Sequence, residues 1–312
     1  MFGFERLRAG SSEDLQALTG CTVLIFDGGA RASVDVRGAS PGTRETALLA
    51  PDKQMDRIDA ILLTGGSAFG LAAASGVMRY LSLHNMGYKT PWKLIPIVPA
   101  AVVYDLNIGN ADRFPDEEMG YRVTEAAMKG EFNTGCRGAG TGTTVGKWSG
   151  LENAMKSGQG IGEVEFKGLR VVAIAVVNAV GDVVDRNGRV IAGAIKDGKF
   201  VASGNGMTER LAAAPVLGTN TTLVAVVTNA KLSKIDLYRI AQRGHDALAR
   251  KIVPVHTSFD GDAVFAVSFD EVDASLDLAA SLAIEAIEVA IDDAVKSAEP
   301  LGGLAAYSSL HK

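Results

Sequence analysis

The feature of this sequence that most constrains the fold is the order of its apolar segments. Short β-type runs dominate the first two thirds, whereas long helical patterns gather toward the end. In residues 273–296 apolar side chains recur at alternating steps of four and three, the spacing of a helix with one core-facing side. Strands grouped in hairpins, together with a few long helices, favour α+β layers over strict βαβ alternation.

The individual runs predict the elements as follows. Residues 21–26, the turn Asp27-Gly28-Gly29 and the alternating residues 32–37 predict a hairpin. A buried strand over 58–63 is followed by a glycine turn and a closely packed helix over 68–81. The other predicted strands are 94–103, 162–166, 169–178, 182–184, 190–191, 221–228 and 263–268, and the other predicted helices are 207–214, 231–252 and 273–296.

Charge and composition exclude several classes of protein. A net charge of −5 provides no basic face for nucleic acid. Cys21 and Cys136 are too few for a disulfide scaffold. The N-terminal residues lack the apolar stretch of a signal peptide, and no apolar run approaches the ~20 residues of a membrane helix. We therefore expect a cytoplasmic protein with neither nucleic-acid nor membrane partners. Four scattered histidines supply a metal site poorly, so we expect no metal and no cofactor.

Two glycine-rich segments could bind an anion. Residues 138–147 fail the P-loop pattern, because Thr141 and Trp148 stand where Gly and Ser or Thr are needed. The turn Gly65-Gly66-Ser67 is better placed, since backbone N–H groups at the start of a helix can hold a carboxyl group. The alternative is that these glycines only let the strand and the helix pack closely.

Asn220-Thr221 offers a different chemistry, although the dipeptide is common. A threonine hydroxyl next to a strained peptide bond can attack the preceding carbonyl, and the resulting ester is then hydrolysed by water. Thr221 would become a new N-terminus, whose amino group, with a pKa of about 8, could act as general base for its own hydroxyl. Such a mechanism needs no catalytic histidine, which suits a chain that has only four histidines.

Three further positions have both a functional and a structural interpretation. Asp260-Gly261-Asp262 places two carboxylates at a turn, either to orient an ammonium or hydroxyl group or simply to form the turn. Asn178 interrupts an apolar run, so its amide is either a structural bridge or a donor into a site. Lys147 is either a surface charge or a cation of the site. Singly, each structural interpretation outweighs the functional one.

Taken together, the chain resembles the L-aminopeptidase D-amidase/D-esterase family, which includes the β-aminopeptidases and the nylon-oligomer (6-aminohexanoate-oligomer) hydrolases. The resemblance rests on residues 62–71, 99–106, 140–147, 177–182 and 220–223, in family order. It implies a single four-layer αββα domain over 1–312, of the N-terminal-nucleophile-hydrolase type. It also implies a precursor that cuts itself between Asn220 and Thr221 into chains 1–220 and 221–312, which stay associated.

The resemblance also implies roles for the site residues. Thr221 would be the N-terminal nucleophile, and Asp260 and Asp262 would orient it and its ammonium group. Asn178 would donate to the oxyanion, and Lys147 and Tyr104 would line the site. Gly65, Gly66 and Ser67 would help to bind the substrate. On physical grounds alone, the backbone N–H groups near Gly65 and Gly66 could also donate to the oxyanion. Many members have serine where this chain has Thr221, a departure that looks more like the nylon-oligomer branch.

The function that follows is hydrolysis of amide bonds in short peptides, amino-acid amides or 6-aminohexanoate oligomers, through an acyl-enzyme on Thr221. One alternative is an N-terminal-threonine acyltransferase of the ornithine acetyltransferase kind, which needs an acceptor amine. The other is a non-catalytic binding protein on the same fold. The resemblance also implies a homo-oligomer, a tetramer of cleaved heterodimers.

Overall fold

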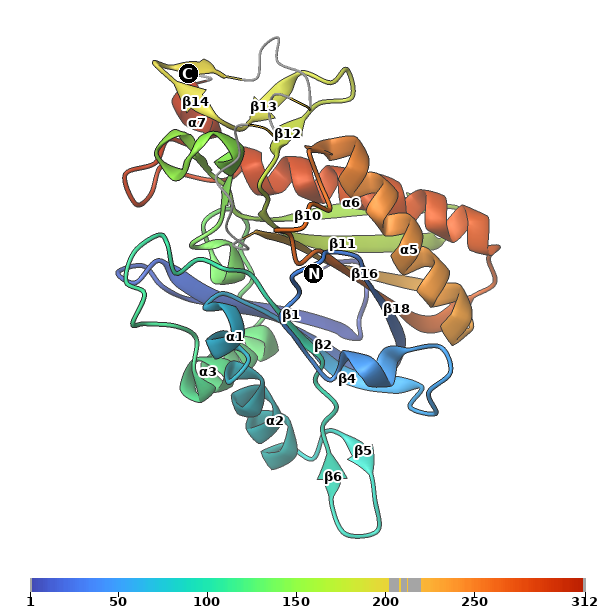
Figure 1. The fold of residues 1–312 in the computed structure, drawn as a ribbon. Helices are drawn as coiled ribbons and strands as arrows, with labels where there is room; N and C mark the ends of the chain where they lie inside the picture. The colour runs from blue at the N-terminus through green and yellow to red at the C-terminus, as the bar shows by residue number, and fades with distance from the viewer. Residues whose placement is uncertain (1, 202–207, 209–211, 213–219, 311–312) are drawn as a thin grey trace.

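The computed structural model describes residues 2–201, 208, 212 and 220–310, and these form four layers (Figure 1). One outer layer is a pair of helices, α5 (Lys234–Lys251) and α6 (Leu276–Lys296). The other contains α2 (Ala73–Leu83) and α3 (Glu117–Lys129). Between them lie two layers of β-strands, so the expected αββα arrangement is confirmed.

The strands of both middle layers belong to one hydrogen-bonded sheet. Within the described residues it has nine strands, in the order β10-β11-β16-β18-β2-β4-β7-β3, and β1 also pairs with β2. The β16–β18 and β4–β7 pairs are parallel and the others are antiparallel, so the sheet is mixed. The strands are β1 (Leu7–Asp14), β2 (Thr19–Val36), β3 (Thr43–Arg44), β4 (Arg57–Thr64), β7 (Ala100–Val102), β10 (Gln159–Phe166), β11 (Leu169–Asn178), β16 (Thr221–Ala230) and β18 (Ala263–Val272).

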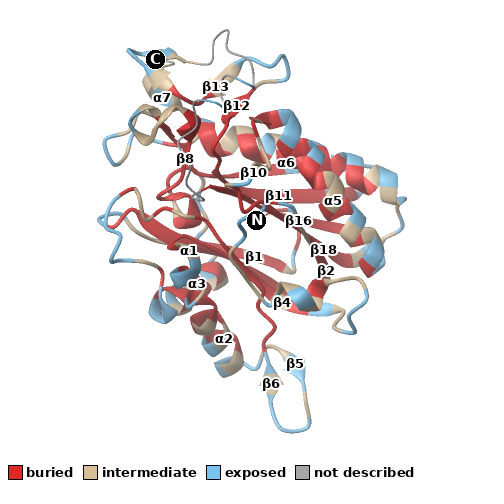
Figure 2. Cartoon of the chain, viewed as in Figure 1, coloured by how far each residue is buried: buried red, intermediate tan, exposed pale blue. Residues whose placement is uncertain are grey.

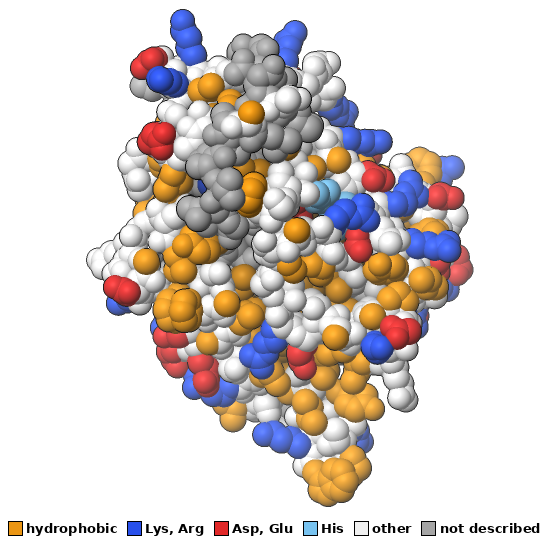
Figure 3. Space-filling model, viewed as in Figure 1, with side chains coloured by type: hydrophobic (Ala, Val, Ile, Leu, Met, Phe, Trp, Pro, Cys, Tyr) orange, Lys and Arg blue, Asp and Glu red, His pale blue; other side chains and the backbone are white. Residues whose placement is uncertain are grey.

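Smaller elements border this framework. They are α1 (Ser67–Gly70), α7 (Tyr307–Leu310), β5 (Tyr88–Lys89), β6 (Leu94–Ile95), β8 (Thr144–Val145), β9 (Met155–Lys156), β12 (Asp182–Val184), β13 (Val190–Ala192), β14 (Ile195–Lys196), β15 (Lys199–Phe200) and β17 (Ile252–Val253). The β5–β6 hairpin projects from the body, and apolar side chains gather at its tip (Figure 3). Elsewhere on the face drawn in Figure 3, acidic and basic side chains are interspersed.

Strand β2 connects the two middle layers and replaces the predicted hairpin. Its first part pairs with β1 and β4, and its last part pairs with β18. Between these parts the register against β4 shifts, and Gly28 and Gly29 have φ values of 76° and 72°. The prediction of a turn here was wrong, because two glycines with left-handed φ also suit a bulge that bends one continuous strand.

Three apolar cores separate the four layers. Along β16, Leu223, Ala225 and Val227 join the core between the two middle layers. Val224 and Val226, on the opposite face, join the core beneath α5 and α6. A third core lies between β2, β4 and the helices α2 and α3. The central strands are therefore buried on both faces (Figure 2), which explains why they appear in the sequence as continuous apolar runs.

Some of the remaining predicted elements have altered ends and others are divided in two. The structure also contains elements that were not predicted. The strand expected over 94–103 is divided into β6 and β7, because Pro96 and Pro99 cannot donate to a ladder. The helix expected over 68–81 is divided into α1 and α2. Strand β1 and helix α3 were not predicted. The helix expected over 207–214 lies almost entirely outside the described residues. Across the described chain, no helix has both the length and the apolarity to cross a membrane.

Candidate active site

Strand pairing brings the predicted site residues Asn178, Thr221 and Asp260 to one end of the central strands. Thr221 is the first residue of β16, and its antiparallel partner is Asn178, the last residue of β11. On the other side of β16, Asn220 forms a parallel bridge with Asp260, just ahead of β18. Segments far apart in the sequence therefore meet around one peptide bond, between Asn220 and Thr221.

Two donors converge on the carbonyl oxygen of Asn220. The hydroxyl of Thr221 donates to this oxygen, and the N–H of Gly261 donates to it at 2.9 Å. Thr221 is only 4% exposed. A hydroxyl beside the preceding carbonyl, with an N–H on the same oxygen, is the arrangement that nucleophilic attack with oxyanion stabilisation requires.

The two carboxylates of the Asp260-Gly261-Asp262 turn have different partners. Asp262 accepts the N–H of Thr222 at 2.6 Å through Oδ1, and it contacts Nδ1 of His256 at 2.7 Å through Oδ2. Asp260 accepts the N–H of Thr257 at 2.8 Å and its hydroxyl at 2.6 Å, both through Oδ2. Asp262 therefore bonds directly to the main chain next to Thr221, whereas Asp260 is held within its own turn.

Burial and charge displace the pKa of Asp260. Its removal from water is the largest cause, and the nearby Asp262 carboxylate adds to it, so the pKa rises to about 6. The hydrogen bonds from Thr257 and the charge of Lys147 act in the opposite direction. Asp260 can therefore gain or lose a proton near neutral pH.

Lys147 is buried at the same place. Its Nζ donates to the backbone oxygen of Asn178 at 3.0 Å and to the side-chain Oδ1 of Asn178 at 2.7 Å. Burial lowers the pKa of the ammonium group to about 7, although the charges of Asp260 and Asp105 oppose this shift. Lys147 therefore also exchanges a proton near neutral pH.

Asn178 bridges three segments at the end of β11. Its Oδ1 accepts from Lys147 and from the N–H of Thr144 at 3.1 Å, and its Nδ2 donates to the backbone carbonyl of Tyr104 at 2.9 Å. Tyr104 therefore reaches this cluster through its main chain. The structure pairs Asn178 with Thr221 across the two strands and gives the Asn178 amide the bridging contacts that a buried amide needs.

The turn at Gly65, Gly66 and Ser67 has no comparable arrangement. Its N–H groups donate within the chain: Gly65 to Gly20 O at 2.8 Å, Gly66 to Asp105 Oδ1 at 2.7 Å and Ser67 to Val103 O at 3.0 Å. A Cβ added at Gly65 would lie 2.1 Å from Asp105 Oδ2. These contacts correspond to the close-packing interpretation, and a substrate would have to displace one of them.

Sequence reasoning missed two residues near this cluster, Asp105 and His256. The buried carboxyl of Asp105 accepts from Gly66 and from the hydroxyl of Thr19, and burial raises its pKa to about 6. The signal available for Asp105 was an acidic residue directly after an apolar run. For His256 it was the position of the residue just before the Asp260-Gly261-Asp262 turn.

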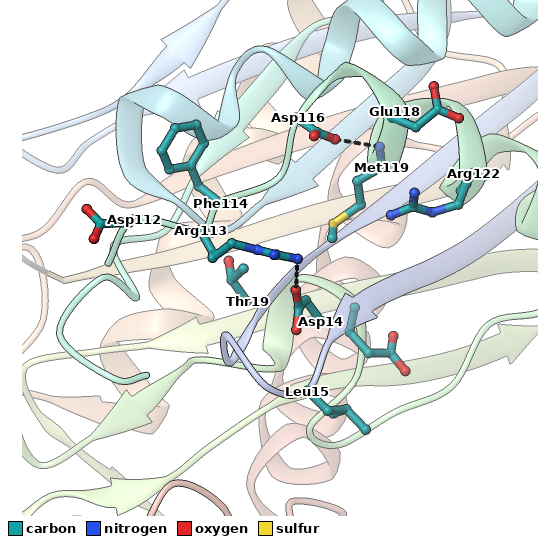
Figure 4. A pocket seen from close by; sticks show the side chains of 11 residues that line it. Asp14, Leu15, Thr19, Asp112, Arg113, Phe114, Asp116, Glu118, Met119 and Arg122 are labelled. Atoms are coloured by element: carbon teal, nitrogen blue, oxygen red, sulfur yellow. Dashed lines mark hydrogen bonds and ion pairs between the residues drawn. The ribbon is translucent and has the colours of Figure 1, made fainter. Parts of the chain in front are cut away.

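A separate cavity of about 810 Å³ lies between the turn that joins β1 to β2 and the start of α3 (Figure 4). Arg113 donates to Asp14 across it at 2.7 Å. None of the residues around Thr221 lines this cavity, although Thr19 on its wall donates to Asp105. Within the described part of the chain, no three His, Cys, Asp or Glu side chains are grouped as a metal site would need.

Comparison with known sequences identifies a family over almost the whole chain. The sequence profile of peptidase family S58 matches residues 3–308. An uncharacterized aminopeptidase of Mycobacterium leprae is 37% identical over 319 residues, covering 93% of this chain and 86% of that protein. A 6-aminohexanoate-oligomer endohydrolase of Kocuria sp. is 33% identical over 280 residues, covering 87% of this chain and 75% of that protein.

Comparison with solved structures identifies the fold. A β-aminopeptidase of Burkholderia sp. superposes with a TM-score of 0.69 at 18% identity, covering 98% of this chain and 90% of the other. An L-aminopeptidase D-Ala-esterase/amidase of Ochrobactrum anthropi, a variant of the N-terminal-nucleophile hydrolase fold, superposes with a TM-score of 0.70 at 18% identity, covering 96% and 86%. The chain therefore has an N-terminal-nucleophile-hydrolase-like fold.

Proposed function

The chain belongs to peptidase family S58, whose members hydrolyse peptide and amide bonds, and on this premise we propose that it is a self-processing N-terminal-threonine amidohydrolase. The observation that carries the proposal is the pair of donors on the Asn220 carbonyl oxygen, one of which is the Thr221 hydroxyl. This arrangement supports self-cleavage between Asn220 and Thr221.

Self-cleavage proceeds in two steps. The Thr221 Oγ1 attacks the carbonyl carbon of Asn220, and the N–H of Gly261 stabilises the charge on the carbonyl oxygen. The C–N bond then breaks, the nitrogen of Thr221 takes the hydroxyl proton, and an ester links Asn220 to Oγ1. Water hydrolyses the ester, which leaves a carboxylate on Asn220 and a free amino group on Thr221.

The two chains stay associated because the cut falls at the start of a buried strand. Strand β16 would remain hydrogen-bonded to β11 of the larger chain, and β18 would remain bonded to β2. All ten residues of β16 are buried, and its two faces belong to two different apolar cores. Such packing holds the pieces together without the covalent bond.

Turnover uses the same groups on an external amide. The free amino group of Thr221 takes the proton from Oγ1, which attacks the substrate carbonyl, and the leaving amine takes that proton as the acyl-enzyme forms. Water then releases the acid. Asn178 and Lys147 stabilise charge at the reacting carbonyl, while Asp260 and Asp262 orient the threonine and its ammonium group. Tyr104 borders the site, whereas the turn at residues 65–67 would contact a substrate only by giving up one of its own hydrogen bonds.

For the substrate, we propose short amides that carry a free amine, which the two carboxylates would attract. Relatives include a 6-aminohexanoate-oligomer endohydrolase, so linear 6-aminohexanoate oligomers and amino-acid amides are the first compounds to test. The assembly we propose is a tetramer of cleaved heterodimers, which native mass measurement would test. We propose that no metal or cofactor takes part.

The decisive experiment is the intact mass of the purified protein under denaturing conditions. We expect two chains, residues 1–220 and 221–312, with Thr221 at the second N-terminus. Thr221→Ala should give one uncut, inactive and still folded chain, because it lacks the hydroxyl. Thr228→Val, at the other end of β16, is the matched control and should still be cut.

Three outcomes would contradict the proposal. A Thr221→Ala protein that is cut and active would exclude this nucleophile. Product that forms from an amide or ester only when an acceptor amine is supplied would indicate an acyltransferase. A wild-type chain that stays whole and reacts with no amide or ester probe would indicate a binding protein on the same fold.

A further inference from the structure

His256 is attached to the Asp262 carboxylate at two points. Its ring Nδ1 lies 2.7 Å from Asp262 Oδ2, and its backbone N–H donates to the same oxygen at 3.3 Å. The other carboxylate oxygen accepts the N–H of Thr222. The Asp262 side chain therefore joins the His256 loop to Thr222, the residue that follows Thr221. Asp262 is only 1% exposed.

The main chain of Asp262 is already fixed, which leaves only its side-chain torsions to be set. Its carbonyl oxygen accepts the N–H groups of Arg37 at 3.0 Å and Gly38 at 3.1 Å. The two donors from His256 lie on one carboxylate oxygen and the donor from Thr222 on the other. Because groups from two segments hold both oxygens, they restrict the carboxylate to a single orientation.

The conformation of His256 is itself unusual. Its φ of 54° lies in the left-handed region, which few residues other than glycine adopt and which persists where the surroundings impose it. The ring packs edge to face against His245, with 4.7 Å between ring centroids. Among the described residues its Nε2 is buried without a hydrogen-bond partner, so the proton of a neutral ring is best placed on Nδ1, facing Asp262.

We propose that His256 is a positioning residue that holds Asp262 against the start of β16, so that the main chain beside Thr221 is fixed for reaction at the Asn220 carbonyl. The inference rests on the proposed self-cleaving function and adds to it a residue that does not touch the reacting atoms. The ring of His256 contacts Asp262 and His245; Asp35 and Arg37 in turn lie near His245, and Asp260 lies near Asp262.

The test compares two amides at position 256 that differ in where they place an N–H group. In His256→Asn the amide nitrogen takes the position of Nδ1, and asparagine tolerates a left-handed φ. In His256→Gln the nitrogen lies one bond further out. Self-cleavage is followed after pulsed cell-free synthesis and dilution into buffers of different pH, which requires no external substrate. His84→Asn, at the exposed end of α2, is the control, and Thr221→Ala precursors report folding by thermal melting.

We expect His256→Asn and His84→Asn to cut within about threefold of the wild-type rate, whereas His256→Gln and His256→Ala cut about tenfold more slowly, the equivalent of one charge-assisted hydrogen bond. Loss of the donor also disfavours the charged carboxylate pair, so the acid midpoint of self-cleavage should move to higher pH in the slow variants. A purely structural role would leave that midpoint unchanged.

The inference is overturned if folded His256→Gln cuts at the wild-type rate with the wild-type midpoint, or if His256→Asn is as slow as His256→Gln. Should His256→Ala fail to fold, the two amides still decide the question. Failure of the proposed function is a different result, because then the wild-type chain itself does not cut.

Discussion

The turn after β4 and the start of β16 both place small polar residues at the end of a buried strand, yet they use their polar groups differently. At Gly65–Ser67 every N–H donates to an oxygen of the protein, and the Asp105 carboxyl, whose pKa burial also raises, is held by donors from Gly66 and Thr19. At Thr221 a hydroxyl lies on a carbonyl oxygen, and Asp260 and Lys147 are buried nearby with pKa values displaced toward neutrality. The N–H groups of the turn are all used in hydrogen bonds within the protein, whereas the start of β16 has a hydroxyl beside a carbonyl group and two side chains that can exchange a proton.

Under the proposed function, this difference separates a region that serves stability from a region that serves chemistry. A buried N–H that finds an oxygen stabilises the fold at no electrostatic cost. A buried carboxyl or ammonium group costs free energy unless it becomes neutral, so displaced groups that lie beside a reactive hydroxyl are candidates for a functional site. If the comparison is correct, substitutions at the start of β16 should change reactivity, and substitutions at the turn should change only stability.

After loss of the Thr221 hydroxyl itself, the largest effect should come from Lys147→Met, which removes a buried cation from the strand start. We expect self-cleavage and amide hydrolysis to fall by about 10²-fold, the lower end of the cost of losing one electrostatic contact at a reacting carbonyl. Lys234→Met is the matched control, because Lys234 also donates to backbone carbonyls but binds those of Leu48, Lys53 and Met55. Equal losses of activity in both variants would show that Lys147 has no specific role in the site.

Lys147 should also give stability a characteristic pH dependence. Its pKa falls from 10.5 in the unfolded chain to about 7 in the folded one, so between these values the unfolded chain binds the extra proton and stability rises with pH. We expect urea unfolding in a Thr221→Ala background to show this rise above pH 7. Relative to the same chain carrying Lys147→Met, the free energy of unfolding should increase by up to about 1.4 kcal/mol per pH unit. Parallel curves for the two proteins would contradict this.

A smaller effect is expected from Asp260→Asn. Wild-type self-cleavage should decline as the pH falls through about 6, because protonation removes the charge of Asp260. The variant should be about tenfold slower at a pH of about 8 and should lack that decline, since an amide does not titrate. Asp59→Asn is the control: burial also raises the pKa of Asp59, but this residue bonds the N–H of Ile97 away from Thr221. A decline that persists in Asp260→Asn would assign it to another group.

The sequence was informative where chemistry and periodicity are local. The segments around Thr221, Asn178 and Asp260 suggested candidate residues, which the structure brings together, and β16 and α6 were predicted from their apolar spacing. Strand β1 was not, because its residues LRAGSSED carry little apolar pattern and become a strand only by pairing with β2. His256 was missed because its importance depends on a left-handed φ and on contact with Asp262, neither of which a single sequence displays.

Helix α3 was missed for a different reason, since its signals were present. Asp116 accepts the N–H of Met119 as an N-cap, acidic residues occupy the first turn, and Gly130 ends the helix with a φ of 74°. These signals are local, and the helix could have been predicted from them. The hydrogen bonds of the N–H groups at Gly65–Ser67 could not have been predicted, because their acceptors at Gly20, Val103 and Asp105 come from other parts of the chain.

The smallest effect on reactivity, and the sharpest test of the comparison, is Gly66→Ala at the turn. Gly66 has a φ of 79°, and an added Cβ would lie 2.6 Å from Cβ of Phe114. We expect the free energy of unfolding to fall by about 1–3 kcal/mol through the clash and the backbone strain. Gly168→Ala, with a φ of 82° and nothing within 4 Å, should show the backbone cost alone. Self-cleavage of folded Gly66→Ala should stay within about twofold of wild type, whereas a larger loss would make the turn part of the site.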